Sequence, residues 1–174
     1  YYLSQGNGLW LHLVNVTLAV NWFGDSLDGT LARYRKMQRP RYGFYVDHMV
    51  DAFSTMFIVG GLALSGYLSA GIGFGILIVY LILSINVYLA TYTLGTFKIS
   101  FGKVSPTKGR ILLALWNYII LYVPAITVAG TVVSLTDMAG VGGILALSAI
   151  LIVSVVRNTV ALYRLEPLER NNKG

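Results

Sequence analysis

Five long apolar segments constrain what this chain can fold into. They cover residues 9–34, 44–68, 72–97, 108–135 and 141–164. A helix that spans a membrane needs roughly 20 predominantly apolar residues, and each segment reaches that length. Strands of a membrane barrel would be shorter and would alternate apolar with polar side chains, which these segments do not. The sequence therefore predicts an all-α integral membrane protein, a polytopic bundle with five transmembrane helices in this chain.

Composition agrees with a membrane protein built as one domain over residues 1–174. The chain is 56% hydrophobic and 11% charged, whereas a soluble domain carries about 25% charged residues. The absence of cysteine excludes disulfides, thiolate metal sites and thiol nucleophiles. The net charge of +6 is explained by basic loops that face anionic lipid, so we expect membrane lipids and no nucleic acid as partners.

The basic residues predict how the bundle is oriented. All 13 Lys and Arg residues fall near alternate helix ends: around the first connection, around the connection after the third segment, and towards the C-terminus. Because basic loops stay on the cytoplasmic side, these ends are predicted to be cytoplasmic. The chain would then begin outside, and one further helix upstream would restore a cytoplasmic start. We therefore expect a multi-pass protein with six helices, of which the first precedes this chain.

Four of the seven acidic residues lie in the first two apolar segments, namely Asp25, Asp28, Asp47 and Asp51. Asp25 and Asp28 share one helix face, and Asp47 and Asp51 share another. The short basic connection over residues 34–42 should make the two helices antiparallel neighbours and bring both pairs together at the cytoplasmic end. Oxygen ligands suit Mg²⁺ or Mn²⁺, and four carboxylates would balance two such ions. The pattern predicts a two-metal site of the kind that clamps a phosphoryl group.

Two other interpretations of these carboxylates are open. They could pair with neighbouring arginines, although four carboxylates in two membrane helices are hard to explain in that way. They could also bind an ion in transit, as in a divalent-cation transporter or another ion-binding membrane protein. Against transport, the four lie at one end of the predicted bundle, and only Asp137 is acidic at the other end.

The segment resembles a known family in its residue spacing. It reads D-x2-D-G-x2-A-R-x9-G-x3-D-x3-D, with fixed residues at Asp25, Asp28, Gly29, Ala32, Arg33, Gly43, Asp47 and Asp51. At typical residue usage, eight fixed positions match by chance on the order of once in 10¹⁰ starting points. This spacing is similar to the signature of the CDP-alcohol phosphotransferase (phosphatidyltransferase) family.

The resemblance implies a fold of six transmembrane helices, often as a homodimer. It implies an enzyme of phospholipid synthesis in which a CDP-linked donor gives its substituted phosphoryl group to an alcohol and CMP leaves. The implied metal ligands are Asp25, Asp28, Asp47 and Asp51, and Asp51 would also be the catalytic base. The implied nucleotide and diphosphate contacts are Asp28, Gly29, Ala32, Arg33 and Gly43. A third reading, an inactive member of this fold, is disfavoured by the intact motif.

The substrates remain open between two branches of the family. His48, directly after Asp47, resembles the branch that transfers choline or ethanolamine phosphate from CDP to diacylglycerol. Lys108 stands where that branch is expected to carry Glu. The basic residues Lys103, Lys108 and Arg110 instead suit a phosphorylated polar acceptor of CDP-diacylglycerol, or form only a cytoplasmic basic loop. His48, these three residues and Arg157 are candidate acceptor or headgroup contacts.

Polar and small residues inside the apolar segments predict helix packing. Asn86, Asn117 and Asn158 are expected to form hydrogen bonds between helices rather than to line a pocket. Glycines in or beside these segments, including the pair at residues 142 and 143, are expected to let helices approach closely.

Overall fold

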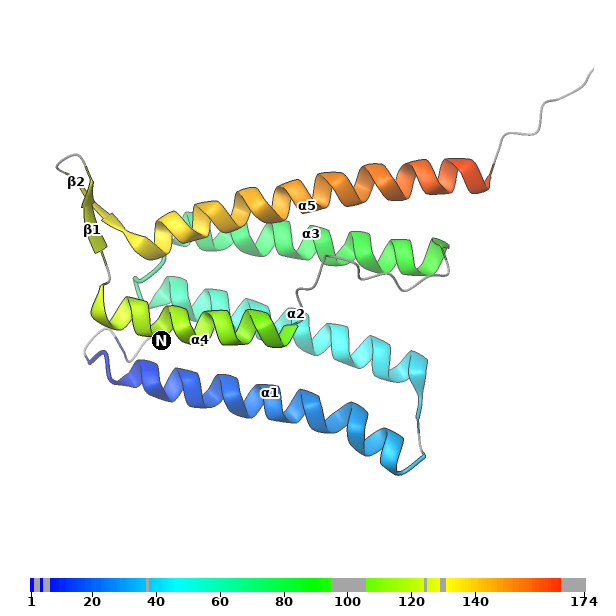
Figure 1. Cartoon of the computed structure of the whole chain (residues 1–174), viewed down its shortest axis with the longest axis horizontal. Coiled ribbons are helices and arrows are strands. Elements are labelled where there is room, and N and C mark those ends of the chain that lie inside the picture. The colour runs from blue at the N-terminus through cyan, green and yellow to red at the C-terminus, as the bar shows by residue number, and fades with distance from the viewer. Residues whose placement is uncertain are drawn as a thin grey trace, which may run out of the picture.

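The computed structural model describes residues 1, 4, 7–36, 38–94, 106–123, 125–128 and 131–166, without the side chains of residues 25, 28, 29, 106–110, 128 and 131. Five helices make up most of this part (Figure 1): α1 (Trp10–Tyr34), α2 (Pro40–Leu64), α3 (Ala70–Leu94), α4 (Pro106–Tyr122) and α5 (Leu135–Leu165). Two short strands, β1 (Ala125–Val128) and β2 (Thr131–Ser134), lie between α4 and α5.

The described part of the chain is mostly helical, as predicted, and the strands correct the predicted helix over residues 108–135, which ends early. The α4 helix ends at Tyr122, and an antiparallel hairpin pairs Ala125 with Ser134 and Val128 with Thr131. Pro124 follows the end of α4, where proline cannot continue a helix. The residues beyond it are largely β-branched, as strands prefer. The residues of the hairpin are as hydrophobic as those of a membrane-spanning helix, so hydropathy alone did not distinguish the two.

The bounds of α2 differ from the predicted range of 44–68 at both ends. The helix begins at Pro40, because proline has no N–H to lose at the first helical position and its φ suits a helix. It ends at Leu64, and Gly66 follows with a φ of 75°, a conformation that glycine adopts without steric cost. Within the described residues, the third predicted helix ends at Leu94, and residues 95–105 lie outside them.

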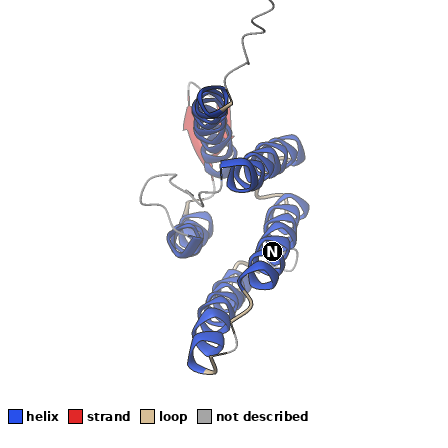
Figure 2. Ribbon diagram, turned by 90° about the vertical axis from the view of Figure 1, so that its right-hand side faces the viewer, coloured by secondary structure: helices blue, strands red, loops and turns tan. Residues whose placement is uncertain are grey.

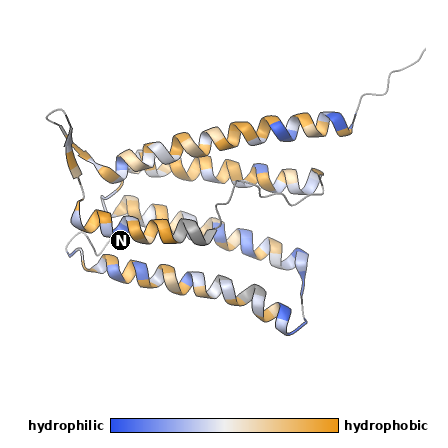
Figure 3. Cartoon of the chain, in the orientation of Figure 1, coloured by the Kyte–Doolittle hydropathy of each residue, from blue (hydrophilic) through white to orange (hydrophobic). Residues whose placement is uncertain are grey.

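Two of the helices are long and apolar enough to cross a membrane. They are α3, with 25 residues, and α5, with 31, and Figure 3 shows that hydrophobic residues make up most of both helices. The chain exposes 12734 Å², whereas a compact soluble monomer of 19.0 kDa would expose about 8,400 Å². Many large apolar side chains are among the exposed ones, including Phe57, Phe74 and Ile78. These features favour a membrane protein, and the other three predicted spans remain predictions.

The helices pack in a chain of neighbours. The α5 helix lies along α3, α3 contacts α2, and α1 contacts α4; Figures 1 and 2 show α5 and α1 at opposite edges of the bundle. The buried apolar core consists of Leu11, Leu62, Leu68 and Ile120, with Tyr1 and Tyr67 packed against it. All of these residues lie at the end of the bundle that carries the hairpin. The closed core is therefore at the end opposite the α1–α2 connection.

Side-chain amides join the helices, as predicted. Asn117 of α4 is buried and donates to Asn15 of α1 at 2.7 Å, and it accepts from the Tyr1 hydroxyl at 2.8 Å. Burial raises the pKa of Tyr1 to about 12, so this hydroxyl keeps its proton at neutral pH. Asn86 of α3 donates to Ser154 of α5 at 2.7 Å, and Asn158 of α5 donates to Asn86 at 3.5 Å. The prediction of interhelical hydrogen bonds is confirmed for all three asparagines.

Close packing of α3 and α5 depends on Gly140. A methyl group there would lie 2.6 Å from Ile72 Cγ2 and 3.1 Å from Leu68 Cδ1, while one at Gly142 would meet nothing within 4 Å. We expect Gly140→Ala to lower the free energy of unfolding by about 1–3 kcal/mol through overpacking. Gly142→Ala should leave stability unchanged or raise it slightly, since alanine favours helix. Thermal unfolding of both variants in detergent checks this; equal effects would contradict it.

Candidate functional site

The predicted site residues lie at the end of the bundle where α1 passes into α2. Asp28 is six residues before the end of α1, and Asp47 is seven residues after the start of α2. With a rise of about 1.5 Å per residue, they lie at similar levels, about 9 and 10.5 Å from the connection. Asp25 and Asp51 lie at about 13.5 and 16.5 Å. The antiparallel arrangement of the two helices (Figure 1) therefore puts the backbone positions of Asp28 and Asp47 at similar heights in the bundle.

On α1, the positions of Asp25 and Asp28 can be related to the buried residues of the helix by their spacing. Leu18 is buried, and Asn21 and Ala32 are partly buried. Residues seven apart share a face of a helix to within about 20°. Asp25 follows Leu18 by seven residues and precedes Ala32 by seven, and Asp28 follows Asn21 by seven. The backbone positions of Asp25 and Asp28 therefore share a helix face with Leu18, Asn21 and Ala32.

An unpaired amide lies one turn before Asp25 on this face. The Oδ1 atom of Asn21 is buried and, among the described residues, has no hydrogen-bond partner. A buried acceptor without a partner is costly. Asn21 was not among the sequence-predicted site residues, and its spacing of four from Asp25 is the signal that could have identified it.

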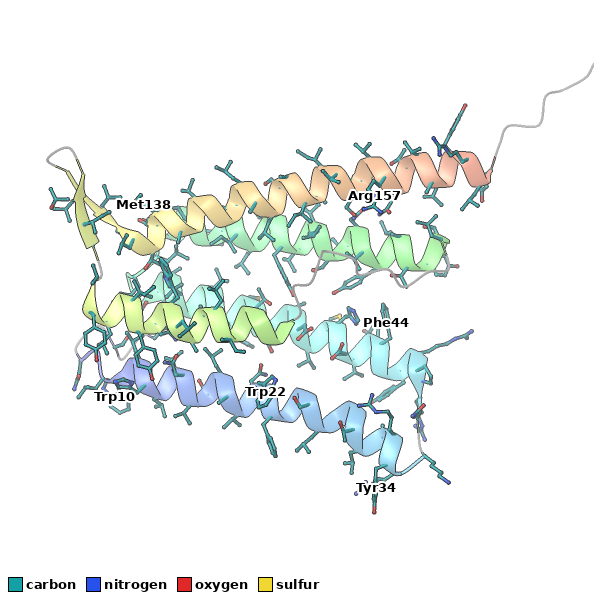
Figure 4. All side chains as sticks on the ribbon, viewed as in Figure 1. Trp10, Trp22, Tyr34, Phe44, Met138 and Arg157 are labelled. Atoms are coloured by element: carbon teal, nitrogen blue, oxygen red, sulfur yellow. The ribbon has the colours of Figure 1, made fainter. Side chains whose placement is uncertain are left out.

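On α2, the two carboxylates occupy adjoining faces. Phe44, His48 and Asp51 are partly buried and lie on the side of α2 that meets α3; Figure 4 marks Phe44 there. Asp47 is 63% exposed, and it lies about 100° around the helix from His48. Asp51 therefore borders the α2–α3 contact, while Asp47 lies on the open flank of α2.

Gly43 and Gly61 share this flank with Asp47. A methyl group at Gly43 would meet nothing within 4 Å, so the backbone is accessible there. A methyl group at Gly61, near the closed end of the bundle, would lie 3.6 Å from the Tyr1 ring. The Tyr1 hydroxyl in turn donates a hydrogen bond to Asn117 of α4. Asp47 therefore lies on the side of α2 that faces Tyr1 and the α1–α4 pair.

The contacts of Asp47 do not support neutralisation by arginine. Its Oδ2 lies 3.7 Å from His48 Nδ1, and no Lys or Arg among the described side chains pairs with it. Arg33, in the last turn of α1, is exposed, and its Nη2 donates to Thr30 Oγ1 at 3.3 Å. The guanidinium therefore lies at the same end of the bundle as Asp47 without pairing with that carboxylate.

The predicted direct packing of α1 against α2 is not observed. The closest partner of α1 is α4, and that of α2 is α3. Within the described part of the chain, no three His, Asp or Glu side chains form a group that could hold a metal. The Asp25, Asp28 and Gly29 side chains lie outside that part, so the four-carboxylate site stays a prediction.

The candidate acceptor contacts do not form one group in the described residues. Lys103 lies outside them, and Lys108 and Arg110 belong to the first turn of α4, where side chains are not described. Arg157 is exposed on α5 (Figure 4). Among the predicted contacts whose side chains are described, namely His48 and Arg157, only His48 has a recorded contact with a carboxylate of the motif.

A cavity between α2 and α3 brings in residues that the sequence did not predict. Its volume is about 160 Å³, and it is lined by His48, Asp51, Tyr80, Leu83, Ser84, Val87 and Tyr88. Tyr80, Ser84 and Tyr88 are each four residues apart, so they share one face of α3. This polar spacing inside an apolar segment is the signal that could have identified them.

The His48 ring is fixed at the edge of this cavity. Its Nδ1 lies 2.6 Å from the Phe44 carbonyl oxygen. Its ring centroid is 4.1 Å from that of Phe44 and 4.9 Å from that of Tyr88, which meets it edge-on. Such aromatic pairs hold a side chain in one orientation. His48 thus forms part of the cavity wall together with Asp51. Its ring is not directed to the side of α2 on which Asp47 lies.

At the opposite end of the bundle, Asp137 has a structural role. Its Oδ1 accepts from the backbone N–H of Ser69 at 2.7 Å, and its Oδ2 accepts from the Ser69 hydroxyl. Ser69 directly precedes α3, so this carboxylate caps the helix. The acidic residue at the far end is therefore occupied by protein donors.

The chain matches no protein-family model, no curated protein and no solved structure.

Proposed function

We propose that this chain is a membrane enzyme of phospholipid synthesis, a member of the CDP-alcohol phosphotransferase family. It transfers a substituted phosphoryl group from a CDP-linked donor to an alcohol, and CMP leaves. The donor and acceptor are either CDP-diacylglycerol with a polar alcohol or a CDP-amino-alcohol with diacylglycerol. The protein acts as a multi-pass homodimer, with the carboxylates at the cytoplasmic face.

One observation carries this proposal. Leu18 of α1 is buried, Asn21 and Ala32 are partly buried, and Asp25 and Asp28 stand at backbone positions seven residues from these. The two carboxylates of α2 begin at the matching level on the next helix. This relation between the motif positions and the buried positions of α1 supports the proposal.

The donor set fits two divalent ions. Aspartate oxygens with no sulfur or imidazole ligand among the four motif positions suit Mg²⁺ or Mn²⁺. The ions would be held by Asp25, Asp28, Asp47 and Asp51, and when bound they would supply positive charge that stabilises the diphosphate and the leaving CMP.

The remaining groups have roles that follow from their positions. Asp51 borders the cavity between α2 and α3, so its carboxylate can accept the proton of an alcohol held there. Arg33 is exposed at the same end of the bundle and can bind a phosphate oxygen with two N–H donors. Gly29, Ala32 and Gly43 lack bulk, which leaves room for the nucleotide beside the backbone.

Ion transport is the weaker proposal. A carrier would need polar groups that lead from the carboxylates to the far end of the bundle. Asp137 is the acidic residue there, and Ser69 occupies both of its oxygens. The closed apolar core of Leu11, Leu62, Leu68 and Ile120 lies at that end. Both features oppose an ion path.

The test is CMP release by purified protein in lipid with Mg²⁺ or Mn²⁺. One set of reactions pairs CDP-diacylglycerol with a panel of polar alcohols, and the other pairs CDP-choline or CDP-ethanolamine with diacylglycerol. We expect metal-dependent release from one donor class that a chelator abolishes. Neither release nor binding of any CDP compound, in folded protein that binds divalent metal, would contradict the enzyme and favour an ion-binding protein.

A further inference from the structure

The end of the bundle where α1 passes into α2 carries a dense patch of positive charge. Five of the 13 Lys and Arg residues fall within nine positions there, namely Arg33, Arg35, Lys36, Arg39 and Arg41. We call these five residues the basic patch. No acidic residue lies between Asp28 and Asp47 in the sequence. All five side chains are exposed, and within the described part of the chain none of them forms an ion pair with a carboxylate. A surface of this kind attracts an anionic partner.

The backbone holds these charges together at one end of the bundle. The N–H groups of Arg35 and Lys36 donate to the carbonyl oxygens of Leu31 and Arg33, at 2.9 and 3.1 Å, and so close the last turn of α1. Lys36 has a φ of 52°, the left-handed conformation in which many helices end. The next helix, α2, already begins at Pro40. The basic patch therefore spans two helix ends and a short turn (Figure 1) rather than an extended loop.

Aromatic and apolar side chains continue from the basic patch into the bundle. Tyr34, which is 86% exposed, lies between two arginines of the patch, and the exposed Tyr42 follows Arg41. Tyrosine rings favour the level of the lipid headgroups. Further along both helices, large apolar side chains are exposed, namely Leu27, Leu31, Val46 and Phe53. Cations, phenol rings and apolar side chains thus follow one another in the order of the phosphate, the interface and the acyl chains of a phospholipid.

The motif carboxylates do not cancel this charge at the surface. Asp28 and Asp47, the nearest of them, lie about 9 and 10.5 Å from the connection, deeper in the bundle. Both distances exceed the Debye length of about 8 Å at physiological ionic strength. The outer layer of the bundle at this end therefore keeps an excess of positive charge.

We propose that the basic patch is a docking surface for anionic phospholipids of the adjoining leaflet. Lipid phosphates lie between its Lys and Arg side chains, and the acyl chains run along α1 and α2. The inference does not depend on the proposed function, because it concerns the lipid around the protein and not the substrates. It also goes beyond the orientation of the bundle, which requires basic residues on one side but no preference among lipids.

A fluorophore at the patch tests the inference, and the absence of native cysteine makes the labelling specific. The exposed Gln38 is changed to Cys and labelled, and the full chain is placed in phosphatidylcholine vesicles. Phosphatidylglycerol and phosphatidylcholine that carry the same nitroxide on an acyl chain are the two quenchers. Because each Lys or Arg near an anionic surface raises the affinity about fivefold, we expect phosphatidylglycerol to be enriched at least about fivefold over phosphatidylcholine in 0.1 M salt. In 1 M salt, where the Debye length is about 3 Å, the preference should disappear.

The matched control label is at Val132→Cys. Val132 is 73% exposed on β2, at the opposite end of the bundle. The chain carries no Lys or Arg between Arg110 and Arg157. Both lipids should therefore quench this label equally.

Two variants separate charge from shape. One replaces Arg35, Lys36, Arg39 and Arg41 by Gln, and the enrichment of phosphatidylglycerol at the Gln38→Cys label should then fall to about one. The other replaces the three arginines among them by Lys, which keeps the charge and should keep the preference.

Equal quenching by the two lipids at the patch in 0.1 M salt would overturn the inference. A preference that persists in 1 M salt or in the Gln variant, or one that is lost in the Lys variant, would also overturn it. If the Gln variant does not insert into the membrane, the comparisons of lipids and salt on the unaltered basic patch decide.

Discussion

Asp51→Asn should reduce CMP release by about 10²- to 10⁴-fold, the range lost when a general base is removed. The asparagine keeps the size of the side chain but can neither take the proton of the acceptor nor contribute a negative charge to the metal ions. Because Asp51 is partly buried against α3 and lines the cavity, this near-isosteric change should preserve the fold. The rate is measured with the donor that gives the fastest metal-dependent release from the unaltered protein.

The control for this variant is Asp137→Asn. Asp137 caps α3 at the far end of the bundle, so its replacement should lower stability by about 1 kcal/mol. It should leave CMP release unchanged at temperatures where the protein is folded. An Asp51→Asn variant that retains most of its activity, or an Asp137→Asn variant that loses as much, would contradict the roles assigned to the two carboxylates.

Asp47→Asn should weaken the binding of Mn²⁺ on the order of 100-fold, since affinity in oxygen-ligand sites follows the number of charged ligands. Asp47 is 63% exposed, so the change should not affect folding. Equilibrium dialysis against Mn²⁺ measures the affinity, and CMP release should fall in parallel. Glu166→Gln is the matched control, because Glu166 is an exposed acidic residue that follows the end of α5. Equal affinities in the two variants would place the metal elsewhere.

The helices predicted from hydropathy are confirmed as helices, but the predicted bounds of α2 were wrong because its end signals were not used. Pro40 and Gly66 fix the ends of α2, and both are visible in the sequence. The predicted helix over residues 108–135 is confirmed up to Tyr122 and wrong beyond it, because spanning length was counted without regard to residue type. Pro124 and the β-branched residues around it already favour strands.

Packing between helices was harder to predict than the helices themselves. The interhelical hydrogen bonds of Asn86 and Asn117 followed from the cost of an unpaired amide in an apolar segment. The partners of each helix did not follow, since α1 packs on α4 and α2 on α3. The cavity was missed for the same reason: Tyr80, Ser84 and Tyr88 gain their significance only when α3 lies against Asp51.

The central claim is that carboxylates from α1 and α2 converge on one two-metal site. The most direct test is electron paramagnetic resonance of Mn²⁺ bound to the purified chain in the presence of CDP. We predict two ions per chain with an exchange-coupled spectrum, as expected for ions about 3.5–4 Å apart. A single uncoupled ion, or two that do not sense each other, would contradict the claim that the four aspartates form one site.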